Sequence, residues 1–250
     1  MLTQNTLSVL KELKLIGMLR ALESQMDNPD VRELSFEERL AMLVDSELTT
    51  RDNKKLQARI KAAKLPFNAL IENVDAKTNR GITRSELASL ATGDWLLRKQ
   101  NIIVTGATGV GKSYLACALA HKACRDGFTA QFIRTSHLFQ DLAVARVDGR
   151  YTNLLASYAR KDLLIIDDFG LVPLSAEQRQ DLLEIVEDRY SNSSTLITSQ
   201  FHHEHWHSII GDPTIADAIL DRVVHNSYKL CLKGESRRKP PKGEELQLVG

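Results

Sequence analysis

The chain has 250 residues, enough for one large domain or for a small domain joined to a larger one with a hydrophobic core. Thirty-three lysines and arginines against thirty-two aspartates and glutamates give a net charge of +1, so any affinity for nucleic acid has to come from local patches. Three cysteines without a C-x-x-C pair argue against a disulfide framework or zinc ribbon and indicate buried thiols in a reducing compartment. Without a signal-peptide pattern or a run of about 18 apolar residues, we expect a cytoplasmic protein with no membrane contact.

Residues 1–70 are expected to form a small all-helical module that binds DNA or a partner. Apolar residues recur at helical spacing, and Asn28-Pro29-Asp30 interrupts the pattern. A second helix is predicted to begin near Ser35, where Ser-Phe-Glu-Glu fits the capping box, and to end near Pro66.

Residues 71–100 carry turn residues without a clean period and are assigned to a linker, whereas residues 101–250 have the pattern of an α/β domain. In that domain short β-rich runs alternate with helical stretches, which predicts a parallel, doubly wound sheet. Ser-Ala-Glu-Gln at 175–178 and Asp212-Pro213 are expected to begin two of the helices. The strands are expected at Asn101–Thr105, Thr129–Ile133, Leu163–Ile166, Thr195–Thr198 and Ser227–Leu232.

The sequence GATGVGKS, at residues 106–113, fits the phosphate-binding pattern G-x-x-x-x-G-K-[ST] and lies between a predicted strand and a predicted helix. Glycines permit tight turns, so that backbone N–H groups and the helix N-terminus can surround phosphates. Lys112 is expected to reach the β- and γ-phosphates, and the Ser113 hydroxyl to bind Mg²⁺. The predicted nucleotide-binding residues are Gly106, Ala107, Thr108, Gly109, Val110, Gly111, Lys112, Ser113 and Tyr114.

Two carboxylates follow the apolar run LLII and are expected at the carboxyl end of a buried strand, where ligands bind in open α/β sheets. Asp167 is predicted to hold Mg²⁺ directly or through water, and Asp168 to orient and polarise an attacking water. The pair favours ATP hydrolysis over phosphoryl transfer to a small acceptor, so a small-molecule kinase is the weaker alternative.

Gln200 and Arg222 are further catalytic candidates. Gln200 ends another apolar strand and could sense the γ-phosphate or fix the water, or could be a polar strand end without a role. Arg222, on a predicted helix, could pair locally with Asp221 or Asp217, or could reach the γ-phosphate of a neighbouring subunit.

Several blocks resemble AAA+ ATPases of the IstB type, the transposition helpers of insertion sequences, which are related to DnaC-type helicase loaders. The blocks are GATGVGKSYLACALAHKACRDGF, LLIIDDFG, TLITSQF with a following Trp206, GDPTIADAILDRVVHNSYKLCLKGESRR and, nearer the start, AMLVDSELTTRDNKKLQARIKAAKLP. The resemblance implies a P-loop AAA+ ATPase with a five-stranded parallel sheet of order 5-1-4-3-2, preceded by a helical domain. It also implies ATP and Mg²⁺ as cofactors and a site completed between subunits, with Gln200 at the sensor 1 position and Arg222 as the arginine finger.

The same resemblance implies a helper protein of DNA transposition that assembles on double-stranded DNA as a ring or helical homo-oligomer and regulates a cognate transposase and its target choice. A DnaC-like replicative helicase loader is the alternative. Two departures from the family pattern stand out: Asp168 replaces the common glutamate, and no lid with a sensor 2 arginine is evident, although Arg237 or Arg238 could substitute.

Basic residues in three regions are candidates for DNA contact. Arg51, Lys55 and Arg59 share a helical face, which is either solvated or, given the resemblance, in contact with DNA phosphates. Arg134, with Arg146 and Arg150, could touch DNA in an assembly, and a basic tail including Arg237, Arg238, Lys239 and Lys242 is a further candidate. The run HHEHWH at 202–207 lacks the H-E-x-x-H order and is expected on a surface turn rather than at a zinc site.

Overall fold

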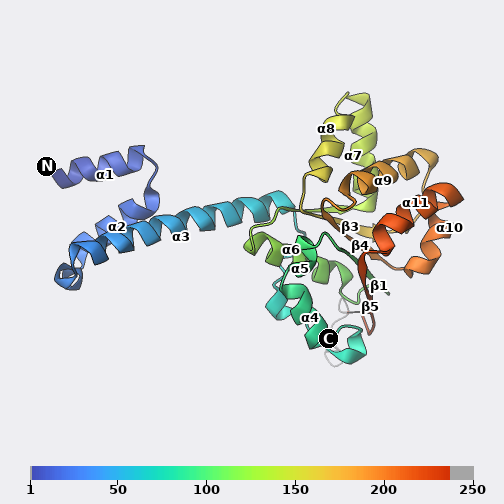
Figure 1. Ribbon diagram of the computed structural model, residues 1–250, viewed down its shortest axis with the longest axis horizontal. Helices are drawn as coiled ribbons and strands as arrows, with labels where there is room; N and C mark the ends of the chain where they lie inside the picture. Colours follow the sequence, from blue (N-terminus) through green and yellow to red (C-terminus); the bar gives the residue numbers. More distant parts are fainter. Residues whose placement is uncertain (1, 237–250) are drawn as a thin grey trace, which may run out of the picture. The chain divides into compact units, whose positions relative to one another are not determined.

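The structure is a computed structural model that describes residues 2–236, and the chain divides into two compact units, Met1–Ala58 and Arg59–Gly250. The first unit contains helices α1 (Leu2–Glu12) and α2 (Ile16–Asp27), the 3-10 helix η1 (Pro29–Glu33) and most of α3 (Phe36–Ala63) (Figure 1). The predicted interruption at Asn28-Pro29-Asp30 is confirmed, because the Asn28 side chain accepts the Asp30 N–H and η1 starts there.

The capping box predicted at Ser35 is also confirmed. The Glu38 N–H donates to Ser35 Oγ, and the Ser35 N–H donates to the Glu38 carboxylate, so α3 begins as expected. The separation of α1 from α2 was not anticipated from the apolar pattern. It falls at Lys14, whose φ of 59° lies in the left-handed region and ends the first helix.

A close crossing joins α2 to α3. Glu47 on α3 accepts hydrogen bonds from the backbone N–H groups of Gly17 (2.7 Å) and Met18 (3.2 Å) at the start of α2, and its other oxygen accepts from Arg51 Nε at 2.7 Å. The hydrogen bond from Arg51 is the main reason that the pKa of Glu47 lies below its usual value. A Cβ at residue 17 would lie 2.4 Å from the carbonyl oxygen of Ser46, so only glycine permits this approach.

The second unit begins inside α3, whereas the sequence places the first boundary at residue 70. Residues 71–100, expected as a linker, form η2 (Ile71–Asn73), η3 (Thr78–Arg80), α4 (Arg84–Ala91) and α5 (Asp94–Leu97), and belong to the second unit. Ile82, Trp95 and Leu96 are buried. These elements are too short to show a period, because each contributes only a few apolar side chains to the core.

The five predicted strands are confirmed, and they form one parallel sheet in the order β2-β3-β4-β1-β5, the predicted 5-1-4-3-2 read from the other edge. Their β-branched and leucine side chains are buried on both faces, as expected of a parallel sheet covered by helices. The strands are β1 (Asn101–Gly106), β2 (Ala130–Arg134), β3 (Leu163–Phe169), β4 (Ser194–Ser199) and β5 (Ser227–Leu232).

Helices cover both faces of the sheet (Figure 1). On one face, alternate strand residues such as Ile103, Leu164 and Ile197 join a core with α7, α8, α9, α10 and α11, while α6 contacts β1 to β4. The caps predicted at Ser175 and Asp212 are confirmed. The helices are α6 (Lys112–Arg125), α7 (Thr135–Val147), α8 (Tyr151–Ala159), α9 (Ala176–Arg189), α10 (Trp206–Ile210) and α11 (Pro213–Val224), with the short η4 (His203–His205) before α10.

The cysteines differ in exposure. Cys117 and Cys124 on α6 are buried, and burial raises the pKa of the Cys117 thiol to about 12. Cys231 is exposed, contrary to the expectation of three buried thiols, because β5 is an edge strand and its residues alternate between the core and solvent. Within the described residues, no helix combines the length and the apolar character needed to cross a bilayer.

We expect Gly17→Ala to destabilise the first unit by about 1–3 kcal/mol, because the added methyl group overlaps the α3 backbone. Amide exchange of α2 and denaturant unfolding would measure the effect. Ser24→Ala, at an exposed position of the same helix, is the control and should leave stability unchanged or slightly raised. Equal unfolding of the wild type and Gly17→Ala would contradict the close crossing.

Candidate nucleotide site

The loop between β1 and α6 has the backbone geometry that the glycine pattern requires. Gly106, Gly109 and Gly111 have φ values of 144°, 86° and 107°, which lie in the region that favours glycine. The segment at and after β5 packs against this loop: a Cβ at Gly106 would lie 2.3 Å from the Leu232 carbonyl oxygen, and one at Gly109 would lie 2.1 Å from Ser236 Oγ. The loop therefore has no room for side chains at these two positions.

The loop curls around the ammonium group of Lys112, and the residue as a whole is 6% exposed. Lys112 Nζ donates to the carbonyl oxygens of Gly106 (2.8 Å) and Ala107 (3.0 Å). Residues 108–114 line a cavity of about 340 Å³, so seven of the nine predicted nucleotide-binding residues meet there. The other two, Gly106 and Ala107, lie at the start of the loop, where their carbonyl oxygens accept the hydrogen bonds from Lys112. An ammonium group beside a glycine-rich loop at a helix N-terminus is suited to bind phosphate.

Asp167, at the carboxyl end of β3, is 2% exposed. Its Oδ1 accepts hydrogen bonds from Ser113 Oγ at 2.7 Å and from Thr198 Oγ1 at 2.6 Å. Burial raises the pKa of Asp167, and these two hydrogen bonds act in the opposite direction. A hydroxyl and a carboxylate at the phosphate loop fit Mg²⁺, which prefers oxygen ligands. The structure thus brings together the two predicted magnesium ligands.

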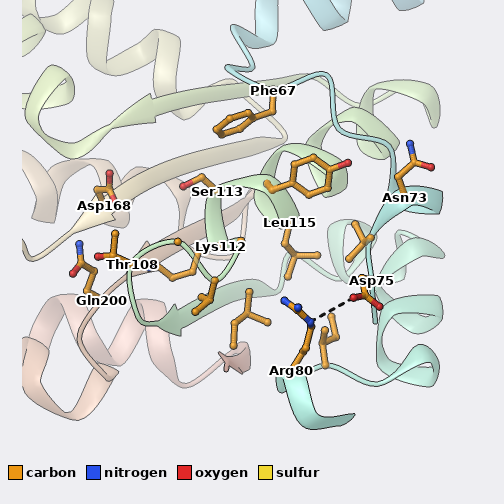
Figure 2. A pocket seen from close by; sticks show the side chains of 17 residues that line it. Phe67, Asn73, Asp75, Arg80, Thr108, Lys112, Ser113, Leu115, Asp168 and Gln200 are labelled. Carbon is orange, nitrogen blue, oxygen red and sulfur yellow. Dashed lines mark ion pairs between the residues drawn. The ribbon is translucent and has the colours of Figure 1, made fainter. Parts of the chain in front are cut away.

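Asp168 leaves the regular strand geometry. Its φ is 58°, and the pairing of β3 with β4 shifts register between Ile166 and Phe169. Its side chain and that of Gln200 line the cavity. In Figure 2 both lie beside Thr108 at one end of the pocket, while Lys112 and Ser113 lie further in.

The opposite end of the cavity is formed by residues whose role the sequence did not indicate. Asn73, Asp75 and Arg80 line it together with Leu115, and Phe67 lies nearer to Ser113 (Figure 2). Arg80 Nε lies 3.4 Å from Asp75 Oδ2. Apart from Leu115 on α6, these residues come from the stretch assigned to the end of the N-terminal module and to the linker. They carry no motif, and only tertiary packing brings them to the pocket.

A family model described as IstB-like ATP binding protein matches residues 8–244. The chain belongs to this family. An insertion sequence ATP-binding protein of Sinorhizobium fredii, y4pL, is 47% identical over 239 residues, which cover 96% of this chain and 98% of that protein. The IS21 ATP-binding protein of Pseudomonas aeruginosa is 32% identical over 92% of this chain and 87% of that protein.

A solved structure supports the fold. The crystal structure of the DnaC helicase loader superposes with a TM-score of 0.56 at 24% identity, over 68% of this chain and 100% of that chain. The resemblance to IstB-type proteins predicted from the sequence is therefore confirmed, as is the α/β fold of DnaC-like AAA+ proteins.

Arg222 lies on α11 and is not among the residues that line this cavity. Its Nη1 donates to the Ala218 carbonyl oxygen at 2.8 Å, and its Nη2 lies 3.0 Å from Glu187 Oε1 on α9. The local pairs considered from the sequence do not form: the Asp221 and Asp217 carboxylates instead lie 3.5 Å from His225 and His207.

The predicted DNA-contacting residues have different surroundings. Arg51 is bound to Glu47, Lys55 lies 3.3 Å from Asp52, and Arg59 Nε donates to the Cys124 carbonyl oxygen at 3.1 Å. Arg134 is exposed at the end of β2. The two further arginines are paired, Arg146 with Glu177 and Asp181, and Arg150 with Asp148. Arg237, Arg238, Lys239 and Lys242 lie outside the described residues.

The histidine run begins on the loop after β4. His202, His203 and Glu204 have donor atoms within 4.8 Å of one another, and His202 Nδ1 lies 3.3 Å from Glu204 Oε2. Burial lowers the pKa of His203, and the nearby His202 and Lys229 lower it further. The positive charge of Lys229 also disfavours a divalent cation at this place.

The phosphate loop leads to a test of its geometry. We expect Gly109→Ala to reduce ATP affinity by at least about tenfold, which corresponds to 1.4 kcal/mol of binding free energy, because the methyl group displaces the loop or Ser236. Titration with a fluorescent ATP analogue would measure it.

Gly127→Ala is the matched control for this experiment. Gly127 has a φ of 99° at the far end of α6, with no atom within 4 Å of an added Cβ. Both variants should lose about 1–2 kcal/mol of stability from the left-handed conformation. A similar loss of ATP affinity in both would show that backbone strain, rather than the loop contact, is responsible.

Proposed function

We propose that the protein is a Mg²⁺-dependent ATPase that converts ATP and water to ADP and phosphate. One observation carries the proposal: Lys112, Ser113 and Asp168 line one cavity, and Ser113 binds the buried Asp167. Phosphate would bind to the loop amides and Lys112, and Ser113 and Asp167 would hold Mg²⁺. The cation, when bound, neutralises phosphate charge.

Of the remaining cavity residues, some would contact the attacking water and others the nucleobase. Asp168, a carboxylate at the phosphate end, would orient and polarise the attacking water, and Gln200 would contact that water or the γ-phosphate. At the other end, the apolar side chains of Phe67, Val74 and Leu115 suit a flat nucleobase. In this orientation ATP would occupy the cavity along its length, and two polar groups beside the phosphate end favour hydrolysis over a metabolite kinase.

The biological role that we propose is that of a helper in DNA transposition. Support comes from family membership and from relatives named insertion sequence ATP-binding proteins. In this proposal the protein assembles on double-stranded DNA as a ring or helical homo-oligomer and regulates a cognate transposase and its target choice. A replicative helicase loader is the second candidate, but the likeness to DnaC at 24% identity supports the fold alone.

DNA contact in such an assembly would be independent of sequence, through phosphate groups. Arg134 is exposed, and Lys55 pairs with the exposed Asp52, so both are accessible to phosphates. Arg51 and Arg59 would have to exchange an intrachain partner for DNA. The helical N-terminal unit is the proposed DNA- or partner-binding module.

Arg222 is proposed to act on the ATP of a neighbouring subunit. It is partly exposed and is not part of its own cavity, so a contact with a γ-phosphate requires a second copy. Its pair with Glu187 is a surface ion pair, which typically contributes at most about 1 kcal/mol, so a phosphate can replace the glutamate.

We expect Asp168→Asn to retain ATP binding and to lower kcat by about 10²–10⁴, the usual contribution of a positioned general base. ATP hydrolysis and nucleotide binding should be measured in parallel, with and without duplex DNA. Asp141→Asn, an exposed aspartate on α7, is the control and should leave both unchanged. Loss of ATP binding in Asp168→Asn would instead assign the residue to the metal or to structure.

A mixing experiment tests the role of Arg222. Arg222→Ala should bind ATP but lose hydrolysis, and Lys112→Ala should lose ATP binding and ATP-dependent assembly on DNA. A mixture should regain activity, because an intact site in one subunit can meet an intact arginine in the other. Full activity of dilute Arg222→Ala, or no recovery in the mixture, would contradict a site shared between subunits.

A further inference from the structure

Thr198, in β4, contacts both residues of the acidic pair. It is fully buried, and its hydroxyl donates to Asp167 Oδ1 at 2.6 Å. The same hydroxyl oxygen accepts the backbone N–H of Asp168 at 3.0 Å. A hydroxyl group has one proton to donate and lone pairs to accept, so the two bonds use complementary capacities of one atom.

The bond to the Asp168 N–H has a structural consequence. The register shift removes Asp168 from the regular β3–β4 ladder, and its φ of 58° is uncommon for a residue other than glycine. Such a conformation persists only where its surroundings fix it. In this place the Thr198 hydroxyl supplies the hydrogen bond that the strand ladder does not.

Neighbouring hydroxyl groups have narrower roles. Ser113 Oγ binds the Asp167 carboxylate, and Thr135 Oγ1 donates to the Asp167 carbonyl oxygen at 2.9 Å. Ser199 Oγ donates to the Phe169 carbonyl oxygen. Within residues 2–236, Thr198 is the residue whose side chain binds both the Asp167 carboxylate and the Asp168 backbone.

We propose that Thr198 is a positioning residue that couples the magnesium ligand Asp167 to the water-orienting Asp168; the inference rests on the proposed ATPase function. A shift of the Asp167 carboxylate moves the Thr198 hydroxyl, and this hydroxyl holds the Asp168 peptide. Gln200 follows Thr198 by two residues, at the end of the same strand. A displacement of this strand end therefore moves Thr198 and Gln200 and, through the hydrogen bond to its backbone, Asp168. Occupancy of the cation site therefore sets the orientation of the hydrolytic carboxylate.

The test compares Thr198→Val, which keeps the shape and removes the hydroxyl, with Thr198→Ser, which keeps the hydroxyl. Thr198→Ala removes the hydroxyl with a different change of volume, so agreement between the Val and Ala variants separates hydrogen bonding from packing. Thr105→Val is the matched control, because Thr105 is buried in the adjacent β1 and its hydroxyl bonds the Leu230 carbonyl oxygen instead.

Three measurements are needed: amide exchange at Asp168, binding of a fluorescent ATP analogue with and without Mg²⁺, and the dependence of hydrolysis on Mg²⁺. In Thr198→Val and Thr198→Ala we expect exchange at Asp168 to accelerate by at least about tenfold, as loss of a hydrogen bond to a buried group implies. Nucleotide affinity without Mg²⁺ should stay within about threefold, while kcat falls and the KM for Mg²⁺ rises, each by about tenfold. Thr198→Ser and Thr105→Val should resemble the wild type.

Each alternative result has a defined meaning. Unchanged exchange at Asp168 in Thr198→Val, or equal defects in Thr198→Ser, would overturn the coupling. A change in kcat with no change in the Mg²⁺ dependence of nucleotide binding or hydrolysis would also overturn it. A wild-type protein that binds ATP without hydrolysing it would refute the proposed ATPase alone, since exchange and Mg²⁺-dependent binding would still report on Thr198.

Discussion

The structure depends on how one buried carboxylate is satisfied. Burying a carboxylate costs free energy unless donors replace water, and Asp167 has two hydroxyl donors on one oxygen. These donors come from the start of α6 and from β4, so Asp167 ties the phosphate loop and two central strands together at one point. The two residues proposed to hold the cation therefore share a hydrogen-bonded network with the backbone of Asp168.

The phosphate end and the arginine on α11 differ in how far their contacts are shielded from solvent. Asp167, Lys112 and Thr198 are buried, and their hydrogen bonds are intramolecular and short. Arg222 is held by a partly exposed carboxylate and by a carbonyl of its own helix, which solvent and competing charges weaken. The residues of the phosphate end are therefore enclosed by the fold, whereas Arg222 is held by contacts that solvent can reach.

The sequence was most informative where local chemistry determines structure. The strands follow from β-branched runs, the loop from its glycines, and three helix starts from side-chain caps, because each depends on residues close together in the chain. The part of the cavity lined by Phe67, Asp75 and Arg80 could not be predicted, since these residues reach it only through packing of short irregular elements. The partner of Arg222 is similarly distant: Glu187 is on another helix, and no local pattern relates the two.

The contact between the segment around β5 and the phosphate loop has a consequence for how the protein acquires its site during synthesis. Gly106 and Gly109 are made early, but the atoms that pack against them belong to Leu232 and Ser236, well over a hundred residues later. Domains fold as units as the chain emerges, and β1 pairs with β4 and β5, both made after it. A nascent chain therefore carries the complete glycine-rich motif before it carries the residues that pack against that loop.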